Sequence, residues 1–272
     1  MLYPVLQDPL RPVVSSLFDR PVGLSIRQML FGAGEQGGWY DVSDMSTLFQ
    51  DAAGTTPVTA VEQPVGRILD LSERGNHATQ ATTTKRPTLK QDANGCYYLS
   101  FDGVDDAMQT GNINLTSTDK MTVWAGVNSS VSQDGTRLGT ILLHPDTGFS
   151  SFTLNSPYAA SNLAFGATTN SAQALAATTA TSALNNNAVL TGAGDLLGRT
   201  AHLRVNGLPL TSATAASGGG NFRSGPLYIG WQVIANRHFN GRLYSLIVRG
   251  AQSSLSQIEA AERYIKQKMR LP

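Results

Sequence analysis

The chain has 272 residues, of which 41% are hydrophobic and only 14% are charged. The hydrophobic share is enough for a large core, whereas the charged share is about half the usual value for globular proteins, so the surface must be rich in Thr, Ser, Asn and Ala. The formal net charge is +1 and the charges are spread along the chain, so we expect no nucleic-acid partner. Because no apolar stretch is long enough to span a bilayer, we also expect no membrane insertion.

The first 38 residues differ from the rest of the chain. Prolines at positions 4, 9, 12 and 21 interrupt an apolar segment that has few ways to form a core of its own. We therefore predict an arm over residues 1–38 and one domain over residues 39–272. Two interpretations of the arm stay open: it docks on a partner subunit, or it packs back along its own domain. The docking side chains would be Tyr3, Leu6, Leu10, Val13, Leu17 and Phe18.

The chain carries no sign of an oxidising destination. Its start lacks a basic stretch followed by an uninterrupted apolar run, so it does not match a secretion signal. The single cysteine, Cys96, excludes an internal disulfide and fits a chain that matures in a reducing cytoplasm. We interpret Cys96 as a small buried side chain rather than a nucleophile.

From Trp39 onward, turn-forming residues recur at short intervals, with β-branched and aromatic stretches between them. This pattern is typical of short strands joined by turns. Eight or more strands without alternating helices predict an all-β sandwich or barrel with antiparallel sheets. The predicted strands are Tyr97–Phe101, Met121–Val127, Thr140–Leu143, Ser151–Leu154, Ala188–Thr191, Ala201–Val205, Leu227–Gly230 and Arg242–Val248.

Two local signals add detail to this outline. Asn206 and Gly207 both tolerate positive φ angles, so a type I′ turn should join Ala201–Val205 to Leu208–Thr211 in a hairpin. Near the C-terminus, Ser256 and Glu259 fit a capping box that would begin a helix lying against the sandwich. The apolar stripe of that helix would contain Ile258, Ala261, Ile265 and Met269, and its negative end would carry Lys266, Lys268 and Arg270.

Three stretches, taken in order, carry a family resemblance. They are LDLSERGNHATQ (Leu69–Gln80), LSFDGVDDAMQT (Leu99–Thr110) followed by MTVWAGV (Met121–Val127), and LYIGWQ through HFNGRLYSLIVRGAQSSLSQIEAAERYI near the C-terminus. Together with the VNG turn at Val205–Gly207, they resemble the laminin-G-like branch of the concanavalin A-like lectin/glucanase superfamily. The resemblance implies a concanavalin A-like jelly roll, an antiparallel β-sandwich with a C-terminal α-helix. The motifs have physical reasons, since Gly103 and Gly241 permit tight turns while Phe101, Phe239 and Leu243 point inward.

A further stretch, Trp39–Asp70, resembles the segment that precedes this domain in structural proteins of tailed phages and prophages. This resemblance implies a virion protein that assembles in the cytoplasm of the host bacterium. Its partners would be other virion proteins, reached through the arm.

The positions of the carboxylates bear on catalysis. Glycanases of this superfamily place two glutamates on one strand, because retaining hydrolysis needs a nucleophile and an acid about 5 Å apart. The glutamates here stand at positions 35, 62, 73, 259 and 262, so none lies between residues 74 and 258. No Gly-x-Ser-x-Gly elbow accompanies the four histidines, and no Cys/His cluster has zinc spacing. We therefore expect no enzyme activity and no required cofactor.

Two groups of residues are candidates for a binding site. Asp102, Asp105 and Asp106 could supply oxygen ligands to calcium, but we favour the interpretation that Asp102 caps its turn while the other two face solvent. A sugar site needs an aromatic stacking face beside amide and hydroxyl groups. The residues that fit this description lie in one predicted loop: Trp231, Gln232, Asn236, Arg237 and His238. Trp231 is equally suited to plug the core.

These observations lead to two main hypotheses. In the first, the protein is a tail-fibre or adsorption component of a tailed phage, whose domain contacts host-surface glycan. In the second, it is a capsid decoration or tail-accessory protein that stabilises the particle and binds no ligand. Either function suits a homo-oligomer, and a fibre favours a trimer. A secreted bacterial lectin and a glycan hydrolase are the less favoured alternatives.

Overall fold

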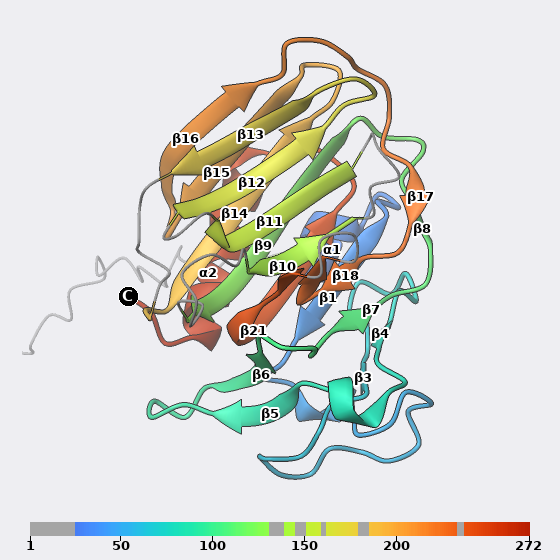
Figure 1. The fold of residues 1–272 in the computed structure, drawn as a ribbon, viewed down its shortest axis with the longest axis vertical. Helices are drawn as coiled ribbons and strands as arrows, with labels where there is room; N and C mark the ends of the chain where they lie inside the picture. Colours follow the sequence, from blue (N-terminus) through green and yellow to red (C-terminus); the bar gives the residue numbers. More distant parts are fainter. Residues whose placement is uncertain (1–24, 131–138, 145–150, 159–161, 179–184, 233–236) are drawn as a thin grey trace, which may run out of the picture.

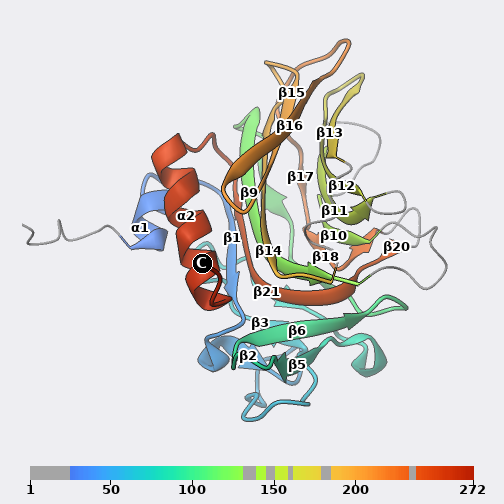
Figure 2. The same ribbon diagram turned by 90° about the vertical axis from the view of Figure 1, so that its left-hand side faces the viewer.

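The computed structural model describes residues 25–130, 139–144, 151–158, 162–178, 185–232 and 237–272. Two antiparallel β-sheets lie face to face in this part of the chain, and helix α2 (Leu255–Lys268) covers the outer side of one sheet (Figures 1 and 2). The predicted all-β sandwich with a C-terminal helix is therefore confirmed. Neither described α-helix has the length and apolar character needed to cross a bilayer.

The first sheet has eight strands, and α2 packs on its outer face. A short strand, β1 (Gly37–Asp41), pairs with the C-terminal half of β21 beside β6. In spatial order the other strands are β16 (Leu208–Thr214), β15 (Thr200–Val205), β14 (Ala188–Asp195), β9 (Lys120–Ser129), β21 (Asn240–Arg249), β6 (Tyr97–Asp102) and β5 (Thr88–Gln91).

The second sheet has nine strands, several of which are only two residues long. Their spatial order is β13 (Gln173–Thr178), β12 (Asn162–Thr168), β11 (Ser151–Tyr158), β10 (Thr140–Leu143), β18 (Tyr228–Ile229), β7 (Met108–Gln109), β4 (Ala78–Thr79), β3 (Arg67–Ile68) and β2 (Leu48–Phe49). Two small ladders flank the sandwich, and two 3-10 turns complete the described elements. These are β17 (Ser224–Gly225) with β8 (Ile113–Asn114), β19 (Trp231–Gln232) with β20 (Arg237–His238), η1 (Met45–Thr47) and η2 (Thr83–Lys85).

Each predicted strand coincides with an observed one. The prediction for Leu227–Gly230 was too long, because β18 ends at Ile229 and Gly230 turns the chain with a φ of +80°. The predicted hairpin is confirmed, since Asn206 and Gly207 have φ angles of +53° and +89° and Val205 pairs with Leu208 across them.

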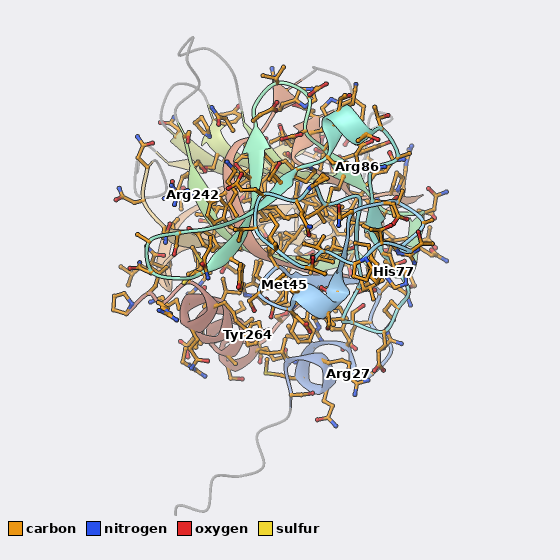
Figure 3. The ribbon with its side chains drawn as sticks, turned by 90° about the horizontal axis from the view of Figure 1, so that it is seen from below. Arg27, Met45, His77, Arg86, Arg242 and Tyr264 are labelled. Atoms are coloured by element: carbon orange, nitrogen blue, oxygen red, sulfur yellow. The ribbon has the colours of Figure 1, made fainter. Side chains whose placement is uncertain are left out.

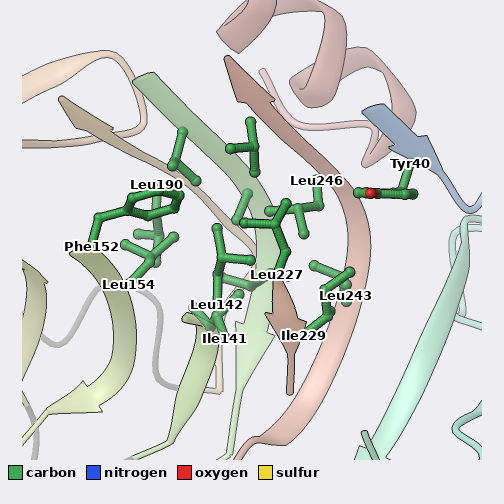
Figure 4. Close-up of a cluster of buried hydrophobic side chains, with 14 of the residues drawn as sticks. Tyr40, Ile141, Leu142, Phe152, Leu154, Leu190, Leu227, Ile229, Leu243 and Leu246 are labelled. Carbon is green, nitrogen blue, oxygen red and sulfur yellow. The ribbon is translucent and has the colours of Figure 1, made fainter. Parts of the chain in front are cut away.

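The inward faces of the two sheets bury one large apolar core (Figure 4). Phe101, Phe239 and Leu243 point into it as predicted, and each is at most 3% exposed. The sheets approach closely where Phe165 on β12 packs over Gly192 on β14. A Cβ atom at position 192 would lie 2.2 Å from the Phe165 ring, so glycine makes room there for an aromatic side chain of the opposite sheet.

A second apolar cluster lies between the eight-stranded sheet and α2. Trp124 on β9 and Ile247 on β21 point outward from the sheet and pack in this cluster with Ala261 and Ile265 of the helix. Alternation of side chains along β9 therefore serves two cores, because Val123 and Ala125 face the other sheet while Trp124 faces the helix.

The helix begins two residues earlier than the predicted capping box. Ser254 is the N-cap, and it exchanges hydrogen bonds with Gln257 in a capping box, so the prediction of Ser256 and Glu259 was wrong. Both pairs fit the same spacing of a hydroxyl residue and a Glu or Gln three positions later. The earlier pair caps the helix because the extended chain, with a ψ of 159°, ends at Ser254.

Residues 25–38 of the predicted arm pack on the sandwich, ahead of the predicted boundary at residue 39. Helix α1 (Ile26–Phe31) buries Leu30 and Phe31 in the cluster beneath α2. Figure 3 shows Arg27 on α1 and Tyr264 on α2 on the same side of the molecule. The described chain thus joins the domain at Ser25, and the predicted docking side chains from Tyr3 to Phe18 lie outside the described residues.

Arg249 on β21 fixes this early segment to the sheet. Its Nε donates to the carbonyl oxygen of Leu30 at 2.6 Å, and its Nη2 donates to the Glu35 carboxylate at 2.6 Å. The Arg249 and Glu35 side chains are only 7% and 15% exposed, so this ion pair is shielded from solvent. Burial acts to raise the pKa of Glu35, but hydrogen bonds from its own backbone and from Arg249 outweigh this and lower it.

A buried histidine packs against the main core. His144 follows β10, is fully buried and stacks on Phe152 with 5.1 Å between ring centroids. Within the described part of the chain, neither ring nitrogen makes a hydrogen bond of normal geometry. Burial lowers the pKa of His144 to about 4, and the nearby backbone of Arg223 offsets this only in part.

We predict that His144→Phe makes the fold less sensitive to acid. Because the folded-state pKa lies below the ordinary value of 6.5, the unfolded chain takes up a proton at this position before the folded chain does. The wild type should therefore lose up to about 3 kcal/mol of unfolding free energy through His144 as the pH falls from about 7 to about 4, and the variant should not. Urea unfolding across this pH range measures the difference, and parallel pH profiles for the two proteins would contradict it.

Candidate functional site

A cleft of about 550 Å³ opens beside β4 and β7 of the nine-stranded sheet, next to the hairpin of β19 and β20. Its volume lies within the range of small-ligand pockets. Five parts of the chain form its wall: the end of β4, η2, the turn after β6, β7 and the hairpin. We call it the Trp231 cleft, and its lining residues are Thr79, Gln80, Ala81, Thr82, Lys85, Val104, Asp105, Ala107, Met108, Gln109, Trp231 and His238.

The aromatic side of the cleft is formed by Trp231 and His238. These residues are register partners in the β19–β20 ladder, so their side chains lie on the same face of the hairpin. Their rings stack with 5.9 Å between centroids and 13° between planes. Tyr228 meets Trp231 edge-on at 5.6 Å and supports it from β18. Trp231 is half-buried rather than enclosed in the core, and it contributes to the wall of the cleft.

The polar side of the cleft comes from the strands β4 and β7 and the residues that follow β4. Thr79 on β4 is the register partner of Gln109 on β7. The Gln80 amide donates to the carbonyl oxygen of Ala107 at 2.8 Å and accepts from the backbone N–H of Thr82 at 3.0 Å. Gln80 therefore holds its neighbours in place, while the side chains of Thr79, Thr82 and Gln109 add hydroxyl and amide groups to the lining.

The turn after β6 closes the cleft and is held by Asp102. The Oδ1 atom of Asp102 accepts backbone hydrogen bonds from Val104, Asp105 and Asp106 at 2.8, 3.2 and 3.3 Å. In return, Asp106 Oδ2 accepts from the Asp102 N–H at 3.1 Å. The turn places Asp105 in the lining and leaves Val104 at the rim, 65% exposed.

Asp102 thus caps the turn as we favoured, but the prediction that Asp106 faces solvent was wrong. Asp106 is only 8% exposed, because its carboxyl group folds back onto the start of the turn. Burial raises the pKa of Asp106 to about 7, and the charges of Asp102 and Asp105 add to this. Burial lowers the pKa of His238, although a hydrogen bond to the Asp106 backbone and the neighbouring carboxylates oppose the change.

The three aspartates fit a calcium ion only in part. One oxygen from each lies within 4.8 Å of the others, which is close enough to share an ion. However, one oxygen of Asp102 and one of Asp106 already accept backbone hydrogen bonds, whereas calcium needs six to eight oxygen ligands. In the part of the chain that the structure describes, no further His, Cys or acidic residue joins this group. Turn capping accounts for the geometry, and calcium binding stays a prediction.

The structure separates the five residues of the predicted sugar site. Trp231 and His238 line the cleft, whereas Arg237 donates to the side chain of Gln232 at 3.2 Å across the hairpin, and neither of these two residues lines it. Asn236 lies outside the described residues.

Sequence reasoning missed the polar side of the cleft. Lys85, Thr79 and Gln109 were not among the predicted site residues, although they contribute an ammonium, a hydroxyl and an amide to the lining. A signal was present, because Thr79 and Gln109 each stand near the end of a family-like stretch, Leu69–Gln80 or Leu99–Thr110. Only the pairing of β4 with β7 shows that these two ends meet.

The charges of the lining bear on catalysis. Among the described residues of the Trp231 cleft, Asp105 is the one carboxylate. Glycoside hydrolysis in most families uses a pair of carboxylates that face the scissile bond from both sides. The described lining therefore does not hold the carboxylate pair that most glycoside hydrolases use.

No protein-family model and no curated protein matches this sequence. Solved structures do share its fold. The receptor binding domain of botulinum neurotoxin D has a TM-score of 0.59 at 11% identity, over 88% of this chain and 54% of that one. The binding domain of botulinum neurotoxin DC in complex with SialylT has a TM-score of 0.57 at 11% identity, over 89% and 52%. The serotype D ligand binding domain in complex with N-acetylneuraminic acid has a TM-score of 0.55 at 12% identity, over 72% and 48%.

At such low identity these comparisons show a shared fold. The chain spans about half the length of the solved structures that it matches. All three are described as binding domains, and none of them as an enzyme.

We predict that Asp102→Ala and Asp105→Ala differ in their effect on stability. Loss of the Asp102 carboxylate removes the cap of the turn and should cost about 1–2 kcal/mol of unfolding free energy. Asp105 makes no side-chain hydrogen bond within the described residues, so its loss should change stability by less than about 0.5 kcal/mol. Urea unfolding of both variants measures this. Equal effects would show that Asp102 is not a cap.

The calcium alternative predicts a different result for the unmodified protein. Under turn capping, millimolar calcium leaves the melting temperature unchanged. A rise in melting temperature that Asp105→Ala abolishes would show that the three aspartates bind the ion.

Proposed function

We propose that the protein is a carbohydrate-binding module that holds glycan in the Trp231 cleft. The observation that carries this proposal is the composition of the cleft: a partly exposed indole beside hydroxyl, amide and charged groups. The flat apolar face of a sugar ring packs on an aromatic ring, while its hydroxyls need donors and acceptors around the edge. The exposed Val104 at the rim adds apolar surface next to this platform.

The preformed walls support binding without rearrangement. Trp231 is held between His238 and Tyr228, and Gln80 and Asp102 fix the loops on the opposite side through backbone contacts. A site that is already ordered loses little conformational entropy when it binds a ligand. The shared fold with solved binding domains is in keeping with this function.

We also propose that the module belongs to the virion of a tailed phage, where it contacts host-surface glycan as part of a tail fibre or adsorption device. This part of the proposal is supported by the resemblance of Trp39–Asp70 to segments of phage structural proteins. Residues 1–24 would attach it to other virion proteins. The assembled form would be a homo-oligomer, and in a fibre this would be a trimer. The low share of charged residues, 14%, suits equally well the alternative, a capsid decoration or tail-accessory protein without a ligand.

We predict that Trp231→Ala and His238→Ala each weaken glycan binding, the former by at least about tenfold. His202→Ala is the matched control, because His202 is an exposed histidine on β15, outside the lining of the cleft. A glycan array with the full chain identifies ligands, and calorimetry measures the variants. Absence of any glycan binding by the folded wild type would favour the decoration function.

We predict that deletion of residues 1–24 leaves a folded domain that no longer joins the particle. This deletion spares α1, which buries Leu30 and Phe31 beneath α2, and β1, which pairs with β21. The measurement is the amount of the variant in purified virions, with its melting temperature as the control for folding. Incorporation at the level of the full chain would contradict attachment through this segment.

A further inference from the structure

Two opposite charges line the Trp231 cleft without neutralising each other. Lys85 lies on η2 and Asp105 lies on the turn after β6. Neither side chain makes a hydrogen bond or an ion pair within the described part of the chain. Burial lowers the pKa of His238, and the charge of the Lys85 ammonium adds to this effect, so Lys85 acts on the cleft.

The other polar groups of the lining are neutral or already engaged. The Gln80 amide is committed to Ala107 and Thr82. The Thr79 hydroxyl donates to the Gln109 carbonyl oxygen at 3.4 Å, and the Gln109 side chain adds an amide to the lining. Lys85 and Asp105 are therefore the strongest donor and the strongest acceptor that face a ligand. Together they give the described lining one positive and one negative formal charge, apart from His238.

This balance disfavours a charged ligand. A ligand carboxylate would gain from Lys85 but would meet Asp105, with the carboxylate oxygens of Asp102 and Asp106 within 4.8 Å of it. A cationic ligand would meet Lys85. A hydroxyl group suits both residues, since it donates to a carboxylate and accepts from an ammonium.

We infer that the Trp231 cleft selects neutral sugars, with the Asp105 carboxylate accepting from one pair of adjacent hydroxyls and the Lys85 ammonium donating to another oxygen of the same glycan. This inference rests on the proposed carbohydrate-binding function and adds the chemical class of the ligand. It differs from what is described for one of the structures of similar fold, which holds N-acetylneuraminic acid, an acidic sugar.

The test compares neutral and acidic probes that otherwise match. We would measure binding of the full chain by calorimetry to a neutral oligosaccharide identified on the array, and to the same oligosaccharide carrying one sialic acid or one uronic acid. The neutral probe is expected to bind at least about tenfold more tightly than either acidic one. Tighter binding of an acidic probe would overturn the inference.

Four variants show whether the two charges act as inferred. Asp105→Asn and Lys85→Gln should each weaken binding of the neutral probe by roughly tenfold, because each removes a charge-assisted hydrogen bond. Glu259→Gln and Lys266→Gln are the matched controls, since both residues lie on α2, away from the lining, and both should bind as the wild type does. A gain in affinity for the acidic probe in Asp105→Asn, without a loss for the neutral one, would also overturn the inference.

The outcomes separate this inference from the function on which it rests. If only acidic probes bind and Trp231→Ala abolishes that binding, the cleft is a glycan site and the assignment of the neutral class is wrong. If no probe of either class binds the folded wild type, both the inference and the proposed function fail.

Discussion

The Trp231 cleft depends on the way in which the chain passes over the buried ring of Phe101. Phe101 is 2% exposed and packs in the main core against Phe239, with 5.8 Å between ring centroids. Gly230 crosses this ring with a φ of +80°, and a Cβ atom there would lie 2.4 Å from it. Only glycine meets both conditions, since other residues rarely adopt this φ and their side chains would strike the ring. The next residue is Trp231, so the core contact sets where the indole lies.

The strand that contains Phe101, β6, also positions the opposite side of the cleft. Asp102 follows Phe101 directly, and its carboxylate holds the turn that carries Val104 and Asp105. Beyond the turn, the backbone N–H of Ala107 donates to the carbonyl oxygen of Lys85 at 3.1 Å, which connects η2 to this segment. Both sides of the cleft are therefore positioned by Phe101. Trp231 follows the glycine that crosses its ring, and the turn on the opposite side begins at the next residue, Asp102. A ligand meets walls whose positions are fixed by buried packing and backbone hydrogen bonds.

Much of the fold could be predicted from the sequence because it is encoded locally. The Asn206–Gly207 turn follows from turn chemistry, and the inward positions of Phe101 and Phe239 follow from the family-like stretches that contain them. The start of α2 could not be fixed, because Ser254 with Gln257 and Ser256 with Glu259 match the same pattern.

The candidate site likewise has one part that could be predicted from the sequence and one that could not. Trp231 and His238 are close in sequence and could be proposed together, whereas Thr79 and Gln109 are 30 residues apart and meet only through the pairing of β4 with β7. Burial of Asp106 was also out of reach, since it depends on the turn folding the Asp106 carboxyl group back onto the Asp102 N–H. Local patterns thus identify the aromatic platform, and tertiary pairing supplies the polar groups around it.

The central claim, that this cleft is where glycan binds, can be tested by the indole N–H signals of the three tryptophans in a two-dimensional NMR spectrum. Trp39 and Trp124 lie beside or beneath α2, on the other side of the eight-stranded sheet from the core, whereas Trp231 lies in the cleft. Titration with a bound oligosaccharide should shift one indole signal, and that signal should be the one missing from Trp231→Phe. A shift confined to Trp39 or Trp124, or no shift at saturating ligand, would place binding elsewhere and contradict the account.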